Sequence, residues 1–440
     1  MRYRLPPASL FVENRRRLAE RLPADAFAVV HAADIPWRCA DGSTRFIQNS
    51  DLFYLTGVDQ EKTTLILCPG HPDPAKREVL FLRETSELIA IWEGNKLTKE
   101  AARGVSGIET VEWNDTFESY LRRFARDFRR LFLNYNEHAR SESPVGVTPD
   151  DRFRADCLVR FPDHRIERLA PLLHDLRITK SEPEIELLRT ACDITRRGFE
   201  RILRFVEPGV HEYEIEAELA HEFFRHGSHR FAYEPIVASG PNACVLHYLQ
   251  NNRICEDGEL VLLDIAAEYA NYNADLTRTI PVNGRFSPRQ RDVYEAVLRV
   301  MRRCIDEAIR PGVHIKREFQ PQVSEWIEDE IVGLGLLDRE TVNRERADET
   351  LPLEKRSFRK WFMHGVSHSL GIDVHDVTPA EGRFVENMCV TVEPGIYLRE
   401  EGFGVRLEND IIVRESGNLD LMADIPVEPD DIETWMTASR

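Results

Sequence analysis

The 440-residue chain contains no uninterrupted apolar run of about 18 residues, so no segment is expected to span a membrane. Its first residues, MRYRLPPASLFVENRRR, lack the apolar core and the small-residue cleavage site of a secretion signal. The eight cysteines are scattered without a C-x-x-C pair, and several lie in apolar contexts such as TTLILC. Together these absences predict a cytoplasmic protein with reduced cysteines.

Positive charge is also scarce, since 58 Lys and Arg residues stand against 76 Asp and Glu residues, giving a net charge of −18. Such a surface repels a phosphate backbone, which argues against nucleic acid as a main partner. The chain lacks G-x-x-x-x-G-K-[ST] and G-x-S-x-G, and GFGVRL lacks the third glycine of a dinucleotide loop. The sequence therefore gives no support for an organic cofactor or for serine-hydrolase chemistry.

The length of the chain predicts two domains. In residues 1–174, short apolar runs indicate buried strands and polar amphipathic stretches indicate helices, which is an α/β pattern. The strands are expected at 26–32, 63–68, 78–83 and 130–135, and helices at 115–129 and 150–160. Ser181 and Glu184 fit a capping box, so a second domain is expected over 175–440.

The second domain shows a faint internal duplication. The sequence P-G-V-H occurs at 208–211 and again at 311–314, each time between two expected helices. Apolar strand runs follow each helix pair, at 231–283 and at 361–414. The shared order of elements predicts a pseudo-twofold domain, and a site between its halves should draw residues from both.

Four acidic residues of this domain lie in apolar segments. Asp264 lies within ELVLLDIAAEY, and Asp275 stands near the start of the returning strand of an expected hairpin. Glu393 ends the run NMCVTVE, while GVRLENDIIV places Arg406 and Glu408 on one face of a single expected strand. Any one of these acids could be satisfied by backbone N–H groups or by arginine. Because one arginine cannot neutralise four buried carboxylates, the combination favours a bound metal.

Three histidines, His364, His368 and His375, are concentrated in FMHGVSHSLGIDVHD. The glycines and serines around them disfavour a helix, so the four-residue spacing of the first two is no strong two-ligand signal. A lone histidine is more often structural than a ligand, but three beside buried acids favour a functional site. One imidazole can complete a carboxylate-rich metal site, and the others can handle protons or substrate.

At these residues the chain resembles the pita-bread metallopeptidases, specifically their aminopeptidase P and prolidase branch. RFIQNSDLFYLTGV and IWEGNKLTKEAA are similar to the creatinase-type N-terminal domain, and PNACVLHY, LLDIAAEY, YNADLTRT, MHGVSHSLGIDVHD, TVEPGIY and GVRLENDIIV follow in family order. The resemblance covers nearly the whole chain. It implies a creatinase-like α/β domain at 1–174, a pseudo-twofold pita-bread catalytic domain at 175–440, and an Xaa-Pro aminopeptidase that releases the residue preceding proline.

The resemblance also implies a centre of two divalent metal ions. Asp264 matches a ligand of one ion and Asp275 and Glu408 match bridging ligands, while His368 and Glu393 match ligands of the second ion. Oxygen-rich ligation with one imidazole favours Mn²⁺, the family's usual activator, with Co²⁺, Fe²⁺ or Zn²⁺ as other possible occupants.

The same resemblance assigns further active-site residues. His247, His364 and His375 match the histidines that contact substrate and the developing tetrahedral intermediate, and Arg406 matches an arginine lining the pocket. Glu393 is expected to accept the proton of the attacking water. Ala266 stands where the family usually has glycine, a departure that removes no ligand.

Two alternatives remain at this point. An Xaa-Pro dipeptidase, or prolidase, uses the same five ligands, although segment 336–361 is more similar to aminopeptidase P. A non-catalytic binding protein of the same fold is the other alternative, but such relatives typically lose metal ligands, and here all five are present.

The N-terminal domain carries no identifiable chemistry of its own. The resemblance implies that it restricts access to the site and supports a homo-oligomer, either a dimer or a tetramer. Trp92 in IWEG lies in a motif that can reach a neighbouring subunit's active site, although a partly buried surface tryptophan is an equally good interpretation.

Overall fold

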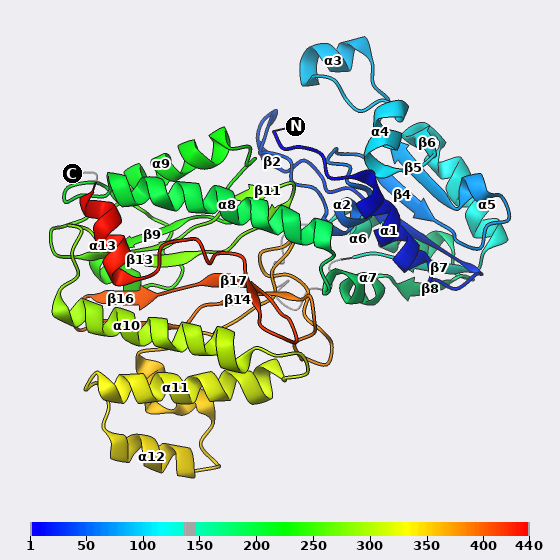
Figure 1. Cartoon of the computed structure of the whole chain (residues 1–440). Helices are drawn as coiled ribbons and strands as arrows, with labels where there is room; N and C mark the ends of the chain where they lie inside the picture. Colours follow the sequence, from blue (N-terminus) through cyan, green and yellow to red (C-terminus); the bar gives the residue numbers. More distant parts are fainter. Residues whose placement is uncertain (1, 136, 138–146, 439–440) are drawn as a thin grey trace. The chain divides into compact units, whose positions relative to one another are not determined.

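The computed structural model describes residues 2–135, 137 and 147–438 (Figure 1). The chain forms two compact units, Arg4–Arg177 and Ile178–Arg440, the latter including Met1–Tyr3. The boundary therefore falls three residues beyond position 174. In the described part of the chain, no helix is both long and apolar enough to cross a membrane.

The first unit is built on a mixed sheet with strand order β6-β5-β4-β1-β7-β8. Its strands are β1 (Ala26–His31), β4 (Thr64–Leu67), β5 (Glu78–Leu82), β6 (Thr110–Trp113), β7 (Arg130–Leu133) and β8 (Arg165–Arg168), with a separate hairpin of β2 (Trp37–Cys39) and β3 (Gly42–Ser43). Its helices are α1 (Ala8–Ala19), α2 (Ser50–Thr56), α3 (Glu87–Glu93), α4 (Lys99–Ser106), α5 (Phe117–Asp127), α6 (Pro149–Arg160) and α7 (Ala170–Arg177). The four strands and two helices expected here are confirmed, as β1, β4, β5, β7, α5 and α6.

The sheet of this unit is held by apolar side chains on alternate strand positions. Phe27 and Val29 of β1 pack with Phe81 of β5 and Leu131 of β7 against Phe124 of α5, and all five are buried. Burying one such side chain contributes roughly 1.5–3 kcal/mol, so these contacts fix the helix on the sheet.

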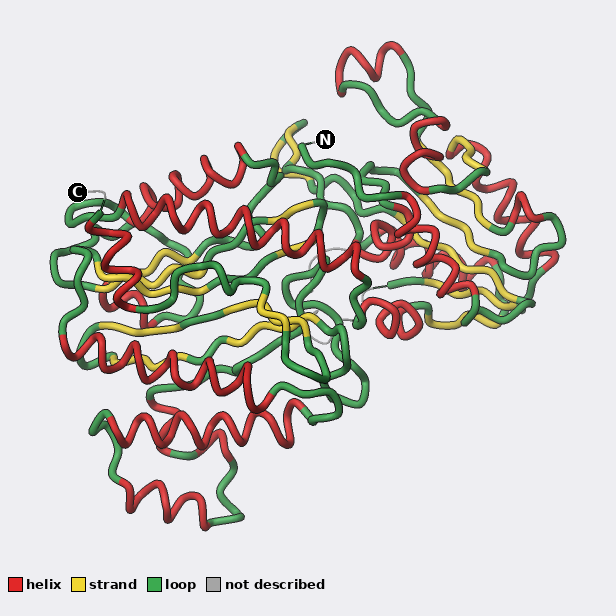
Figure 2. The backbone as a smooth tube through the Cα atoms, viewed as in Figure 1, coloured by secondary structure: helices red, strands yellow, loops and turns green. Residues whose placement is uncertain are grey.

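The second unit places its strands between layers of helices, which Figure 2 shows as yellow segments between red ones. The helices are α8 (Glu182–Phe205), α9 (Glu212–Arg225), α10 (Pro288–Arg303), α11 (Gln320–Gly333), α12 (Arg339–Ala347) and α13 (Pro429–Thr437). The strands are β9 (Ile236–Ser239), β10 (Leu260–Asp264), β11 (Glu268–Tyr269), β12 (Tyr272–Asn273), β13 (Thr277–Pro281), β14 (Cys389–Val392), β15 (Gly395–Leu398), β16 (Phe403–Arg406), β17 (Asn409–Ile412) and β18 (Leu419–Asp420). The predicted capping box of Ser181 and Glu184 does begin α8.

The two halves of this unit have matching turns and matching β-bridges, as the internal duplication predicts. Gly209 between α8 and α9 has φ 101°, and Gly312 between α10 and α11 has φ 89°, so both turns use a conformation that favours glycine. The histidine that follows each turn forms an antiparallel bridge, His211 to Ile254 and His314 to Arg383.

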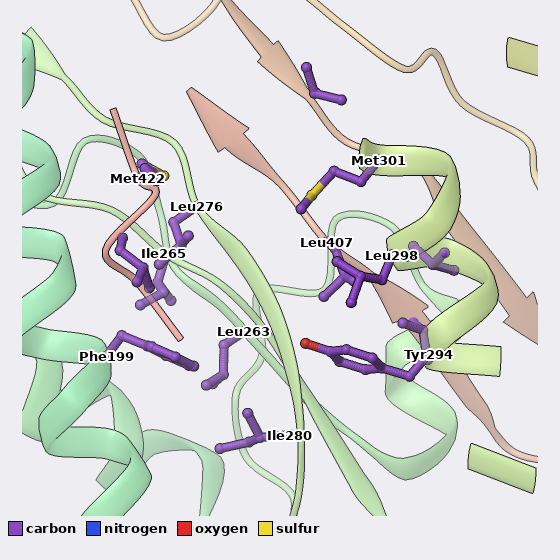
Figure 3. Packing of buried hydrophobic residues seen from close by; sticks show 14 of the residues in the cluster. Phe199, Leu263, Ile265, Leu276, Ile280, Tyr294, Leu298, Met301, Leu407 and Met422 are labelled. Carbon is purple, nitrogen blue, oxygen red and sulfur yellow. The ribbon is translucent and has the colours of Figure 1, made fainter. Parts of the chain in front are cut away.

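The core of the second unit is drawn from both halves (Figure 3). Phe199 of α8, Leu263 of β10 and Ile280 of β13 belong to the same buried cluster as Leu298 and Met301 of α10. Because this cluster lies behind the strands, it fixes the strand ends from which the acidic side chains project.

The single strand expected across Arg406 and Glu408 is wrong. The chain forms β16, which ends at Arg406, and β17, which begins at Asn409. The chain changes partner between them, since Arg406 pairs with Gly395 whereas Asn409 pairs with Val392. On the opposite side the bypassed residues are Glu393 and Pro394, and proline has no N–H with which to continue a ladder. Glu408 therefore lies in the break between two strands rather than inside one.

Candidate active site and metal centre

Each half of the second unit presents two carboxylates at the open end of an antiparallel strand pair. Asp264 ends β10 opposite Thr277, and Asp275 lies two residues before β13 begins. In the other half, Glu393 follows β14 directly and Glu408 directly precedes β17, where Val392 pairs with Asn409. In each half the antiparallel pairing of the two strands therefore brings two acids together.

The histidine segment 362–376 forms no helix, as its glycines and serines predict. Two hydrogen bonds orient His368: its backbone N–H donates to Thr391 Oγ1 at 3.2 Å, and its ring Nδ1 lies 3.0 Å from the carbonyl oxygen of Ser369. Since a carbonyl can only accept, Nδ1 carries a proton, and Nε2 faces Asp275 Oδ2 at 3.4 Å and Glu393 Oε1 at 3.8 Å. Such an outer hydrogen bond is typical of a metal-ligating imidazole.

One cavity of about 430 Å³ is lined by all nine residues that the sequence singled out. They are His247, Asp264, Asp275, His364, His368, His375, Glu393, Arg406 and Glu408. Apolar walls are added by Ile236, Leu246, Leu249 and Val374. The rings of His368 and His375 lie 4.2 Å apart, so the middle and the end of the histidine segment meet at this cavity.

The carboxylates repel one another in the metal-free site. Burial raises the pKa of Glu393 to about 7, and burial together with the charges of Asp275 and Glu393 raises that of Glu408 well above its ordinary value. Burial also raises the pKa of Asp264, although the charge of Arg406 opposes that shift. Four acids sharing one arginine therefore favour the binding of a cation.

Arg406 anchors a chain of hydrogen bonds along one side of the site. Its Nη2 donates to Asp264 Oδ2 at 2.6 Å and its Nη1 donates to the hydroxyl of Tyr397 at 2.9 Å. That hydroxyl lies 2.7 Å from His364 Nε2, while His364 Nδ1 lies 2.7 Å from the carbonyl oxygen of Gly365. Because Nδ1 must donate to the carbonyl, Nε2 accepts from Tyr397. Burial lowers the pKa of His364 to about 3, so this imidazole is neutral.

Sequence analysis missed three residues that hold the site in place: Tyr233 and Thr277 contact the acids, and Tyr397 contacts Arg406 and His364. The hydroxyl of Tyr233 lies 2.6 Å from Asp264 Oδ1 and 2.7 Å from Asp275 Oδ1, and Thr277 Oγ1 donates to Glu408 Oε2 at 2.7 Å. Tyr397 stood within the quoted motif TVEPGIY, which was the one available signal for it. Thr277 likewise stood within the quoted motif YNADLTRT, whereas Tyr233 lies in no quoted motif.

The donor set fits a divalent metal ion. Asp275, His368 and Glu408 each offer a ligand atom, and these atoms lie within 4.8 Å of one another. Carboxylate oxygens with a single imidazole suit an oxygen-preferring divalent ion better than a thiolate-preferring one. In the metal-free protein the charge and hydrogen bonding of Asp275 and the charge of Glu393 raise the pKa of His368 despite its burial, so a proton there takes part of the cation's role.

The metal-free protein is expected to lose stability as the pH rises from 6.5 to 8. Glu393 and Glu408 have raised pKa values in the folded state, so the folded protein holds protons that the unfolded chain has already released. The raised pKa of His368 acts in the same direction. The lowered pKa of His364 opposes this loss near pH 6.5, because the unfolded imidazole is still partly protonated there, but it adds little near pH 8. Each such proton lowers the unfolding free energy by at most about 1.4 kcal/mol per pH unit. Urea unfolding of chelator-treated protein at pH 6.5 and 8.0 measures this slope.

The Glu393→Gln variant should show a smaller slope, because it removes one of the groups with a raised pKa. Glu400→Gln is the matched control, since Glu400 is exposed and pairs with Lys360. Stability that rises with pH over this range in metal-free protein would contradict the expectation.

Comparison with known proteins agrees with this geometry. The family model of metallopeptidase family M24 matches residues 186–415, and that of the aminopeptidase P N-terminal domain matches residues 11–132. The chain is 33% identical to the Xaa-Pro aminopeptidase of Escherichia coli over 98% of both chains. It is 34% identical to that of Haemophilus influenzae over 98% of this chain and 97% of the relative.

Solved structures resemble it over the same length. Zn-substituted E. coli aminopeptidase P in complex with product superposes with a TM-score of 0.86 at 32% identity, covering 99% of this chain and 100% of that one. Aminopeptidase PepP of Pseudomonas aeruginosa gives a TM-score of 0.85 at 31% identity, covering 99% of each chain. The expected aminopeptidase P resemblance and pita-bread fold are thereby confirmed: the chain belongs to the M24 family of metallopeptidases, with an aminopeptidase P type N-terminal domain, and is a peptidase that uses divalent metal ions.

Proposed function

We propose that the chain is a dinuclear Xaa-Pro aminopeptidase that releases the N-terminal residue from peptides with proline in second position. The observation that carries the proposal is the convergence of four carboxylates, two of them buried and two half-buried, and one oriented imidazole on a single cavity. The relatives at 33% and 34% identity that bear this activity in their names support the substrate class.

Two metal ions would be held by the same five side chains. Asp264 would bind one ion, His368 and Glu393 the other, and Asp275 and Glu408 would bridge them. Mn²⁺ is the proposed occupant because oxygen ligands dominate, with Co²⁺, Fe²⁺ or Zn²⁺ as substitutes. When bound, the ions polarise the scissile carbonyl and lower the pKa of a water.

The protein's own groups would move the protons and hold the substrate. Glu393, whose pKa is about 7 before metal binds, would accept the proton of the attacking water. His247 and His375 would donate hydrogen bonds to the oxyanion as it develops. His364, with both ring nitrogens engaged, would stay neutral and keep Tyr397 and Arg406 in place.

Cleavage by metal-stripped protein, with and without added Mn²⁺, tests the substrate class. We expect manganese-dependent release of arginine from Arg-Pro-Pro, and much slower hydrolysis of the dipeptide Ala-Pro. Activity confined to Ala-Pro would move the assignment to an Xaa-Pro dipeptidase. If neither peptide is hydrolysed although metal is bound, both assignments are contradicted.

The chain is further proposed to form a homo-oligomer, either a dimer or a tetramer, through α3. In Figure 1 this helix projects from its own unit beyond α4, and it has no buried residue. Leu88, Ile91 and Trp92 are 65%, 78% and 81% exposed. An apolar surface of this kind is typical of a protein–protein contact, because its exposure to water is unfavourable. A second copy of the chain is the occupant proposed for it.

Trp92→Ala is expected to shift the protein to a smaller species in size-exclusion chromatography at micromolar concentration. Val159→Ala provides the control, because Val159 is 80% exposed on α6 of the same unit. Unchanged elution of Trp92→Ala, with the same sedimentation coefficient as the parent protein, would contradict the role of α3.

A cytoplasmic location is proposed from the thiols. All eight cysteines are described and all are free, and seven of them are buried. A reducing compartment keeps such thiols free.

A further inference from the structure

Glu212 is a buried carboxylate outside the cavity and outside the set of proposed ligands. It is the first residue of α9 and is 0% exposed. Its Oε1 accepts from the N–H and Oγ of Ser239 at 2.7 and 2.8 Å and from Asn242 Nδ2 at 3.2 Å. Its Oε2 accepts from the hydroxyl of Tyr248 at 2.8 Å and from the N–H of Arg253 at 2.9 Å. All five donors are uncharged groups.

The four donor residues bracket the segment that carries His247. Ser239 ends β9, and Arg253 lies fourteen positions later and donates back to Ser239 Oγ at 3.0 Å. Between them, residues 245–252 form turns and irregular structure, so side-chain contacts rather than a helix or strand determine their course. Tyr248, whose hydroxyl binds Glu212, is 7% exposed and directly follows His247, which is exposed at the cavity.

The internal duplication provides a comparison within the same chain. After P-G-V-H, the first half has Glu212 and the second half has Ile315. The backbone contacts are otherwise alike: Glu212 N–H donates to Arg253 O at 2.9 Å, and Ile315 N–H donates to Gly382 O at 2.8 Å. The helix turn can therefore form without a carboxylate. The acid is present only in the half whose following strand leads into the His247 segment.

We propose that Glu212 is a positioning residue, which fixes the segment 239–253 so that His247 faces the reacting carbonyl. A buried carboxylate is retained only when its hydrogen bonds offset the cost of burial, and here all of them go to this one segment or to its ends. The inference rests on the oxyanion role proposed for His247. Loss of a positioned donor costs turnover more than binding, because the hydrogen bond strengthens as charge develops.

Glu212→Gln tests this with little change of shape. The amide nitrogen cannot accept, so one of the two groups of donors loses its partner. We expect kcat on a proline-containing tripeptide to fall about 10- to 100-fold, with a much smaller change in KM and unchanged metal content. Glu218→Gln is the matched control, since Glu218 lies on the same helix and pairs with Arg201 instead.

A double-mutant cycle separates positioning from general damage. In a His247→Ala background, Glu212→Gln should lower kcat by less than about twofold, because the donor that it positions is already absent. An equal fall in both backgrounds would overturn the inference, and so would a loss of bound metal. If His247→Ala lowers kcat but Glu212→Gln does not, this inference is overturned while the proposed role of His247 stands. Full activity of His247→Ala would overturn the proposed role of His247 and this inference with it.

Tyr248→Phe supplies the same test if Glu212→Gln does not fold. It removes one hydroxyl and one hydrogen bond to Glu212 Oε2 while keeping the ring. We expect a kcat loss of roughly 3- to 10-fold that disappears in the His247→Ala background. Persistence of that loss in the His247→Ala background would overturn the inference.

Discussion

Asp275→Asn is expected to lose bound metal and to lower kcat/KM at least about 10³-fold. Asp275 is 5% exposed and faces both His368 Nε2 and the hydroxyl of Tyr233. The asparagine keeps the shape and can still accept from Tyr233, but it removes a negative charge from the group that includes His368 and Glu408. A loss of 10³ in rate corresponds to about 4 kcal/mol, which is of the order that metal catalysis supplies.

Metal content measured after desalting, with kcat/KM determined at several Mn²⁺ concentrations, checks this expectation. Asp257→Asn is the control, because Asp257 is an exposed acid of the same unit that binds Asn283. Without metal, Asp257→Asn should have a melting temperature similar to that of the parent protein. The melting temperature of Asp275→Asn should be similar or higher, because one of several mutually repelling charges is gone. Retention of both metal and activity by Asp275→Asn would contradict the proposed centre.

The acids could be predicted from the sequence because their surroundings are strongly apolar. A carboxylate in LVLLD or CVTVE conflicts with the burial of its neighbours, and only a bound cation or a dense hydrogen-bond network resolves that conflict. The same conflict identifies strands, so β10 and β14 and the acids at their ends were predicted from one signal. The histidine segment was found because three imidazoles in a stretch poor in regular structure are rarely explained by packing.

The supporting hydrogen bonds could not be predicted, because they depend on register and on contacts far apart in sequence. Tyr233 reaches Asp264 and Asp275 across 31 and 42 positions, and Thr277 reaches Glu408 across 131. The break between β16 and β17 was also missed. Alternation of residues 404–413 favours one strand, and the partner change becomes visible only when Pro394 is seen opposite it.

The duplication explains why ligands come from matching places. Two antiparallel strand pairs, β10 with β13 and β14 with β17, end at one cavity. Each pair supplies one acid at the end of its first strand and one just before its second strand. Repetition of the fold thus brings two pairs of acids to one cavity, so the repulsion within each pair is increased by the charges of the other pair. The pKa values of Glu393 and Glu408, both raised by burial and by the other acids, are the electrostatic consequence of that arrangement.

Glu393→Gln is expected to lower kcat about 10³-fold and to flatten the acid limb of the pH–rate profile. General-base catalysis contributes about 10²- to 10⁴-fold, and an amide cannot accept the proton. Glu393 is also a proposed metal ligand, so the substitution can lower metal affinity as well. It lies 3.8 Å from Nε2 of His368, the other ligand proposed for the same ion, and 3.7 Å from His364 Nδ1. The measurement is kcat between pH 5.5 and 9 at increasing Mn²⁺ concentrations, with Glu400→Gln as the exposed control.

The two roles of Glu393 separate at saturating metal. If the residue served only as a ligand, sufficient Mn²⁺ would restore kcat to within a few-fold of the parent value, because occupancy alone would be limiting. If it is the base, kcat stays low at full occupancy, because the neighbouring His364 cannot replace it as proton acceptor: burial lowers the pKa of His364 to about 3, and both of its ring nitrogens are engaged. Restoration of kcat by metal would therefore contradict the proton-acceptor role while leaving the metal centre intact.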